Sequence, residues 1–149
     1  MIRKFLLADD DPDDTELFAE ALMTIDKALE VNIAQNGKEL ILRLQEGKIE
    51  PHLIFLDINM PEMNGWQCLQ RLKSEVNMKD IPVIMYSTSS SSIYGKKAVT
   101  EGAIGFYEKP TNFLQLQDFL KSIANSPKDA LKETLKRLQE AKKHLVYVG

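Results

Sequence analysis

Acidic side chains gather directly after the first apolar run of the chain. Residues 5–8 are apolar, and five of the next six residues are the aspartates at positions 9, 10, 11, 13 and 14. A second apolar run, residues 53–56, also ends on an acid, Asp57. Acids at the ends of buried strands repel one another unless a cation lies among them. The pattern therefore predicts a metal site, and its oxygen ligands favour Mg²⁺.

Helix capping explains part of this acidic cluster without any ligand. Asp11 is expected as an N-cap before a proline at the first helical position, and Asp13 and Asp14 complement the positive end of the helix. Capping does not explain Asp9 and Asp10, which precede the cap. We assign those two to the metal site, with Asp57 as a third oxygen donor.

Two further side chains come at the ends of strand-like runs. Ser87 follows residues 81–86, and Lys109 follows residues 104–107 shortly before a proline. Either could be an ordinary surface residue. Together with three acids and Mg²⁺, however, a lysine and a hydroxyl suit phosphoryl transfer, which depends on positioning and charge neutralisation. In such a site a carboxylate can be the nucleophile and form an aspartyl phosphate.

The elements that must position these residues alternate along the chain. Five apolar runs alternate with five amphipathic stretches, which predicts an α/β sandwich around a parallel sheet. Right-handed crossovers place the carboxyl ends of all strands along one edge, where such sheets bind ligands. In a five-stranded sheet of order 2-1-3-4-5, the strands ending at Asp9-Asp10 and Asp57 are neighbours. In the third helix, Leu69, Leu72 and Val76 are expected to face inward.

Residues 126–149 extend beyond this unit of residues 1–125. A helix is predicted to begin at Pro127, with a stripe of Ala130, Leu131, Leu135, Leu138, Ala141 and Leu145. The stripe either packs against its own chain or forms a homodimer through its leucines. The segment is too short for a separate domain.

Composition narrows the class of protein. The chain has 149 residues and a formal charge of −3, which argues against a general nucleic-acid binder. No apolar run approaches the roughly 20 residues that span a bilayer, and no signal-peptide pattern precedes the acids. A single cysteine, Cys68, excludes an internal disulfide. We expect a cytoplasmic protein that contacts neither membrane nor nucleic acid.

These motifs together resemble the receiver domain of bacterial two-component response regulators. The resemblance covers about residues 2–125 and is carried by Asp9-Asp10, the segment 57–65, Ser87-Thr88 and Lys109-Pro110. It implies a flavodoxin-like (βα)5 fold and a stand-alone regulator without a DNA-binding output domain. The extra C-terminal helix is loosely similar to regulators that pair with phytochrome-type histidine kinases.

The resemblance also implies a role for each residue. Asp57 would be the phosphoacceptor, and a histidine kinase or phosphotransfer protein would be the donor. Mg²⁺ would be held by Asp10, Asp57 and the backbone carbonyl of Asn59, with Asp9 helping through water. Lys109 and Ser87 would contact the phosphoryl group, and a downstream protein would bind the phosphorylated form.

Phe106 falls at the position of the family's switch aromatic, which is often tyrosine and turns inward as the hydroxyl of Ser87 moves. Alternatively, Phe106 is simply a core residue. Two rival functions are a scaffold that signals without phosphate and a small phosphatase with an aspartyl nucleophile. The phosphatase would need a second acid two residues after Asp57, where this chain has Asn59. We therefore expect a phosphoacceptor and not an enzyme, although the resemblance implies slow self-dephosphorylation.

Overall fold

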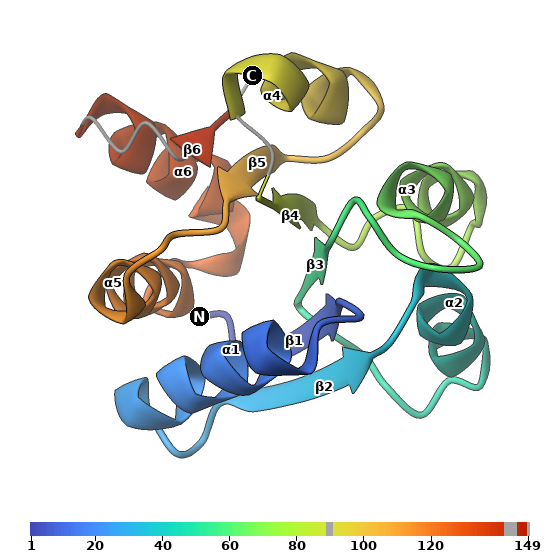
Figure 1. The fold of residues 1–149 in the computed structure, drawn as a ribbon, viewed down its shortest axis with the longest axis horizontal. Coiled ribbons are helices and arrows are strands. Elements are labelled where there is room, and N and C mark those ends of the chain that lie inside the picture. Colours follow the sequence, from blue (N-terminus) through green and yellow to red (C-terminus); the bar gives the residue numbers. More distant parts are fainter. Residues whose placement is uncertain (89–90, 142–145, 149) are drawn as a thin grey trace.

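The computed structural model describes residues 1–88, 91–141 and 146–148 as one α/β unit (Figure 1). Its sheet has six strands in the order β2-β1-β3-β4-β5-β6. The first five strands pair in parallel, and this order confirms the prediction from sequence. Their bounds are Lys4–Ala8 (β1), Glu30–Ala34 (β2), Leu53–Leu56 (β3), Val83–Ser87 (β4) and Gly105–Glu108 (β5).

Helices cover both faces of the sheet. Residues of α1, α5 and α6 share one core cluster, and residues of α2, α3 and α4 share the other, so the sheet is the middle layer (Figure 1). The helices are Pro12–Ile25 (α1), Gly37–Gln45 (α2), Gly65–Ser74 (α3), Ser91–Thr100 (α4), Phe113–Ala124 (α5) and Leu131–Glu140 (α6). Among the described residues, no helix combines the length and the apolar character needed to cross a bilayer.

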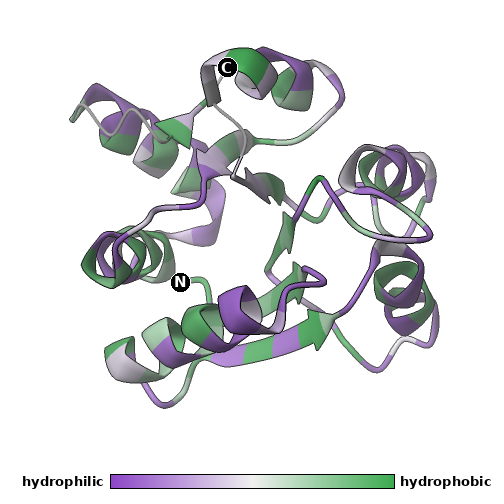
Figure 2. Cartoon of the chain, viewed as in Figure 1, coloured by the Kyte–Doolittle hydropathy of each residue, from purple (hydrophilic) through white to green (hydrophobic). Residues whose placement is uncertain are grey.

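Burial follows the position of each strand in the sheet. Every residue of β3, the central strand, is buried, as expected for a strand covered by helices on both faces. The edge strand β2 alternates between apolar and polar residues, which appear as green and purple bands in Figure 2. The apolar pattern of the sequence thus separates central from edge strands.

Polar side chains fix where the helices begin. Asp11 accepts backbone hydrogen bonds at the start of α1, as predicted, and Asn36 does so at the start of α2. Asn64 and Gln67 form a reciprocal capping box at the start of α3. These caps satisfy N–H groups that have no partner within the helix, and they set the exit angle of each loop that leaves the sheet.

The structure differs from the sequence prediction in several places, including the start of the C-terminal α-helix, which lies at Leu131 and not at Pro127. A sixth strand, Val146–Tyr147 (β6), pairs antiparallel with β5 and was not predicted. Val76 was expected to face inward, but α3 ends at Ser74, and Val76 is 76% exposed. The pattern misled because Val76 continues the spacing of Leu69 and Leu72 beyond the end of the helix.

The C-terminal segment packs against its own chain. A short 3₁₀ turn, Lys128–Ala130 (η1), leads into α6, whose Leu131 and Leu135 are buried in the core cluster of α1 and α5. Two residues of the predicted stripe are therefore covered within the chain, and Leu145 lies outside the described residues. The division of the chain at residue 125 stays a prediction.

Candidate phosphoacceptor site

The acids predicted to form the site lie at adjacent strand ends. Ala8 pairs with Leu56 in the last register position of β1 and β3, so Asp9 and Asp57 follow neighbouring positions. The Asp57 N–H donates to the carbonyl of Ala8 at 2.9 Å, which extends the ladder by one residue. Parallel pairing thus brings together two residues that are far apart in the sequence.

Asp9, Asp10 and Asp57 form a compact group of carboxylates. Each offers an oxygen, and these oxygens all lie within 4.8 Å of one another. Asp9 and Asp57 are buried, whereas Asp10 is exposed at the mouth of the group. Three carboxylates at this separation, two of them shielded from water, fit a hard divalent cation that keeps some of its water ligands.

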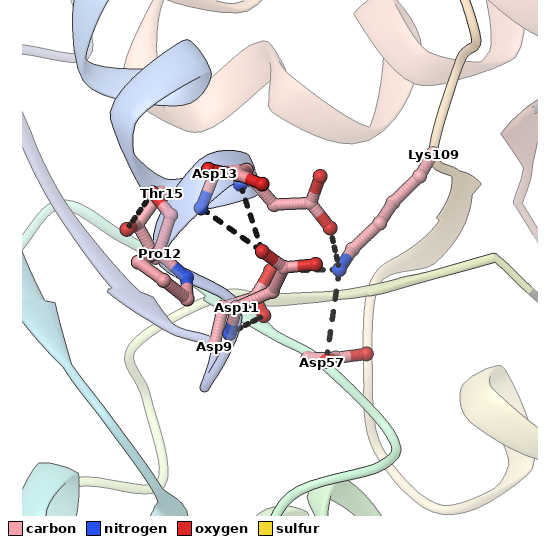
Figure 3. A network of polar contacts seen from close by, with 8 residues as sticks. Asp9, Asp11, Pro12, Asp13, Thr15, Asp57 and Lys109 are labelled. Atoms are coloured by element: carbon pink, nitrogen blue, oxygen red, sulfur yellow. Dashed lines mark hydrogen bonds and ion pairs between the residues drawn. The ribbon is translucent and has the colours of Figure 1, made fainter.

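Lys109, just after β5, is the cation that the described residues place among these acids. Its Nζ donates hydrogen bonds to Asp9 Oδ2 at 2.7 Å and to Asp14 Oδ2 at 2.8 Å. It lies 3.6 Å from Asp57 Oδ2, beyond hydrogen-bond distance, while its side chain is only 9% exposed. Figure 3 shows the lysine reaching from the β5 side of the sheet into the acidic group.

Burial and charge change the protonation of the site. Burial, reinforced by the adjacent Asp9, raises the pKa of Asp57 to about 7, although the positive charge of Lys109 acts in the opposite direction. Burial by itself would lower the pKa of Lys109, but hydrogen bonds to Asp14 and Asp9 outweigh it and raise that pKa. The ammonium therefore stays charged, and its positive charge does not fully offset the effect of burial on the pKa of Asp57.

The loop after Asp57 is held close to the strand that it leaves. The Gly65 N–H donates to the carbonyl of Ile58 at 2.8 Å. A Cβ at Gly65 would lie 2.3 Å from the backbone oxygen of Asp57, so only glycine fits there. Asn59 is exposed in this loop, two residues after Asp57. The start of α3 thus fixes the backbone around both residues.

Ser87 and Phe106 connect the site with β4 and β5. Ser87 is the last residue of β4 and is fully buried, and its carbonyl accepts a hydrogen bond from the Lys109 N–H at 2.8 Å. Phe106 is 1% exposed and pairs with Met85 on one side and Tyr147 on the other. All of the predicted site residues except Phe106 therefore lie at this edge of the sheet or in the loop that leaves it.

Two residues near the site were not singled out from the sequence. Asp14 was assigned to the helix dipole alone, yet its carboxylate bonds to Lys109. Tyr86 lies beneath the same lysine, with its ring centre 5.2 Å from Nζ. The capping pattern identified the start of α1, but it carried no signal that this turn faces the residue after β5.

Comparison with known proteins gives a consistent identification. The profile of the response regulator receiver domain matches residues 5–121. The chain is 35% identical over 97 residues to a protein-glutamate methylesterase/protein-glutamine glutaminase of Rhodospirillum rubrum, which is 64% of this chain but 25% of that protein. The chain thus spans about a quarter of the length of this relative.

Solved structures agree with the profile. The phosphorylated cyanobacterial phytochrome response regulator RcpA superposes with a TM-score of 0.70 at 28% identity, covering 83% of this chain and 91% of that one. The Mn²⁺-bound form of response regulator Rcp1 also gives 0.70 at 28% identity, covering 81% of this chain and 91% of that one. The profile covers well over half of the chain, and the fold and the strand-end acids agree with it. The chain belongs to the response regulator receiver domain family.

Proposed function

We propose that Asp57 accepts a phosphoryl group from the phosphohistidine of a histidine kinase or phosphotransfer protein, and that the phosphorylated chain binds a downstream protein. The observation that carries this proposal is the buried Asp57 carboxylate, which lies beside Asp9 with Lys109 3.6 Å away. Membership of the receiver family supports it, as does the existence of a phosphorylated relative, RcpA.

The reaction is a displacement at phosphorus. A carboxylate oxygen of Asp57 attacks the phosphorus, the P–N bond to the donor imidazole breaks, and an acyl phosphate forms. The incoming group is an anion approaching acids, so the barrier depends on charge neutralisation. The Lys109 ammonium and the Ser87 hydroxyl come from neighbouring strands and would contact the phosphoryl oxygens.

Asp9, Asp10 and Asp57 would hold a Mg²⁺ ion, together with the backbone carbonyl of Asn59. The donor set supports this assignment, because its oxygens converge within 4.8 Å and two of the acids are buried. When bound, the ion offsets repulsion between the attacking carboxylate and the phosphoryl oxygens. The Mn²⁺-bound relative Rcp1 gives further support for a divalent cation.

Signal output is assigned to the ends of β4 and β5. A phosphoryl group that draws in the Ser87 hydroxyl would favour one arrangement of the loop after β4, of α4 and of Phe106. Phe106 is already buried at 1% exposure, so in this chain a small displacement of the ring would suffice. Such a shift needs only a few kcal/mol of preference for one state.

The surface beside the site suits a protein partner. Leu17 is 43% exposed and lines a small pocket with Lys109, Pro110 and Phe113. An exposed apolar residue in a pocket that Lys109 also lines offers a contact for the donor protein. The formal charge of −3 argues against nucleic acid. We place the protein in the cytoplasm and keep a homodimer through the C-terminal extension as a possible assembly.

Enzymatic alternatives have less support. The methylesterase relative matches this chain over 25% of its length, so its activity does not transfer. A phosphatase of the aspartyl class needs an acid where this chain has Asn59. A turnover assay with phosphate esters separates the two cases, because a phosphatase hydrolyses the esters continuously, whereas an acceptor that takes its phosphoryl group from phosphohistidine does not turn them over.

The proposal is tested by intact mass measurement after incubation with acetyl phosphate and Mg²⁺. We expect a mass gain of one phosphoryl group in the wild type and none in Asp57→Asn. Asp13→Asn is the matched control, because Asp13 is an exposed acid in the first turn of α1. A wild type that gains no mass, or an Asp57→Asn variant that gains it, contradicts the proposal.

A further inference from the structure

Asp14 is an acid near the phosphoacceptor that the proposed reaction does not use. Its side chain is 30% exposed, and its Oδ2 accepts a hydrogen bond of 2.8 Å from Lys109 Nζ. The backbone N–H of Asp14 donates to the N-cap Asp11, whereas the Asp14 carboxylate is turned toward Lys109. Asp14 therefore binds the ammonium of Lys109 from the first turn of α1.

Lys109 is shared unequally among three acids. Asp9 and Asp14 accept hydrogen bonds of 2.7 and 2.8 Å, whereas Asp57 Oδ2 lies 3.6 Å away. An ammonium has three N–H groups, and two of them are engaged by acids other than the phosphoacceptor. One N–H is left for a phosphoryl group on Asp57, but the ammonium can move toward that group only by lengthening its hydrogen bond to Asp14.

Asp14 also affects the space available to a divalent cation. An ammonium that moved toward Asp57 would bind the same oxygens that a metal ion needs. While Asp14 and Asp9 hold Lys109, its Nζ stays 3.6 Å from Asp57 Oδ2. Asp14 thus has two opposed effects, because it favours metal binding and disfavours contact between Lys109 and the phosphoryl group.

We propose that Asp14 is a positioning residue that holds Lys109 back from Asp57 and so slows phosphoryl acceptance. This inference rests on the proposed function of Asp57. Removing the Asp14 charge frees the ammonium for the incoming phosphoryl oxygens and also removes one negative charge near the reacting atoms. The chain thereby sets its own rate of phosphorylation through a residue that contacts neither metal nor phosphate.

The first experiment compares Asp14→Asn with Asp13→Asn, which changes the same charge in the same helical turn. With acetyl phosphate at saturating Mg²⁺, we expect Asp14→Asn to be phosphorylated about three- to tenfold faster than Asp13→Asn, the scale of one nearby partly screened charge. Asp14→Glu keeps the charge and should restore a rate close to the wild type. Equal rates in Asp14→Asn and Asp13→Asn overturn the proposal, as does an Asp14→Glu variant as fast as Asp14→Asn.

A magnesium titration without any phosphodonor gives an independent readout. Asp14→Asn should bind Mg²⁺ about threefold or more weakly than Asp13→Asn, because the freed ammonium competes for the same carboxylates. Equal affinities overturn the proposal. If none of the chains accepts phosphate, the proposed function fails, while this titration still decides on Asp14. Circular dichroism confirms that each variant is folded.

Discussion

Tyr147 in β6 packs directly over Gly95 in α4, so that a Cβ at the glycine would lie 2.4 Å from the tyrosine Cγ. Tyr147 also pairs with Phe106 across β5 and β6. The C-terminal strand therefore contacts both the helix and the strand to which we assign signal output. Any movement of α4 or Phe106 changes the fit of this tyrosine.

Gly95→Ala should lower the stability of the wild type and raise it when Tyr147 is removed. Alanine in a helix interior is favoured over glycine by about 1 kcal/mol, but overpacking costs about 1–3 kcal/mol. In a Tyr147→Gly background, the obstructing Cβ and ring are gone, and the helix preference alone remains. Urea unfolding of the four chains measures the effect. The same sign in both backgrounds would show that Tyr147 does not constrain α4.

Leu135→Ala should destabilise the chain by about 2–5 kcal/mol, because it leaves a cavity in a fully buried position. Leu114→Ala is the matched control, since Leu114 is 66% exposed and should change the free energy of unfolding by less than about 0.5 kcal/mol. Light scattering on the same samples reports the oligomeric state. A small loss for Leu135→Ala would mean that α6 is not part of the core.

Metal binding should weaken as the pH falls through about 7, the raised pKa of Asp57. Protons and Mg²⁺ compete for the same carboxylate, and the ionised form binds the metal. Calorimetric titration between pH 6 and 8 tests this range, which lies around that pKa. An affinity that is constant across it would contradict a buried, protonatable Asp57.

The metal-free protein should lose stability as the pH rises from about 4 to about 7, between the unfolded and folded pKa values of Asp57. The pKa of the Asp57 carboxyl rises from 3.8 in the unfolded chain to about 7 in the folded chain, chiefly because of burial. The folded chain therefore binds the proton more tightly. The stabilisation is complete below the lower value and is lost as the pH rises through the upper one. Asp57→Asn should lack this slope. Unfolding curves at several pH values, with chelator present, compare the two chains.

Gly65→Ala should weaken both folding and Mg²⁺ binding, because its Cβ would meet the backbone of Asp57 at 2.3 Å. Gly47→Ala is the control. Gly47 has a positive φ of 72° but nothing within 4 Å of its added Cβ, so the substitution should cost about 1–2 kcal/mol and leave Mg²⁺ affinity unchanged. Equal Mg²⁺ affinities in both variants would show that the loop around Gly65 does not affect the metal site.

The sequence predicted those features that depend on local pattern and on strand topology. The apolar runs located the five parallel strands, and the acids after β1 and β3 predicted the carboxylate group around Asp57. The role of Asp14 was missed because it depends on how α1 packs beside the residue after β5. The strand β6 was missed because two residues carry no periodicity, and its pairing with β5 is entirely tertiary.

The position of β6 has a consequence for how the protein behaves at high concentration. Without it, β5 would present a row of free backbone N–H and C=O groups, a template on which other chains can assemble. Two residue pairs, Phe106 with Tyr147 and Tyr107 with Val146, occupy that row instead. In the part of the chain that the structure describes, the outermost strand on this side is only two residues long, and so short an edge disfavours edge-to-edge aggregation.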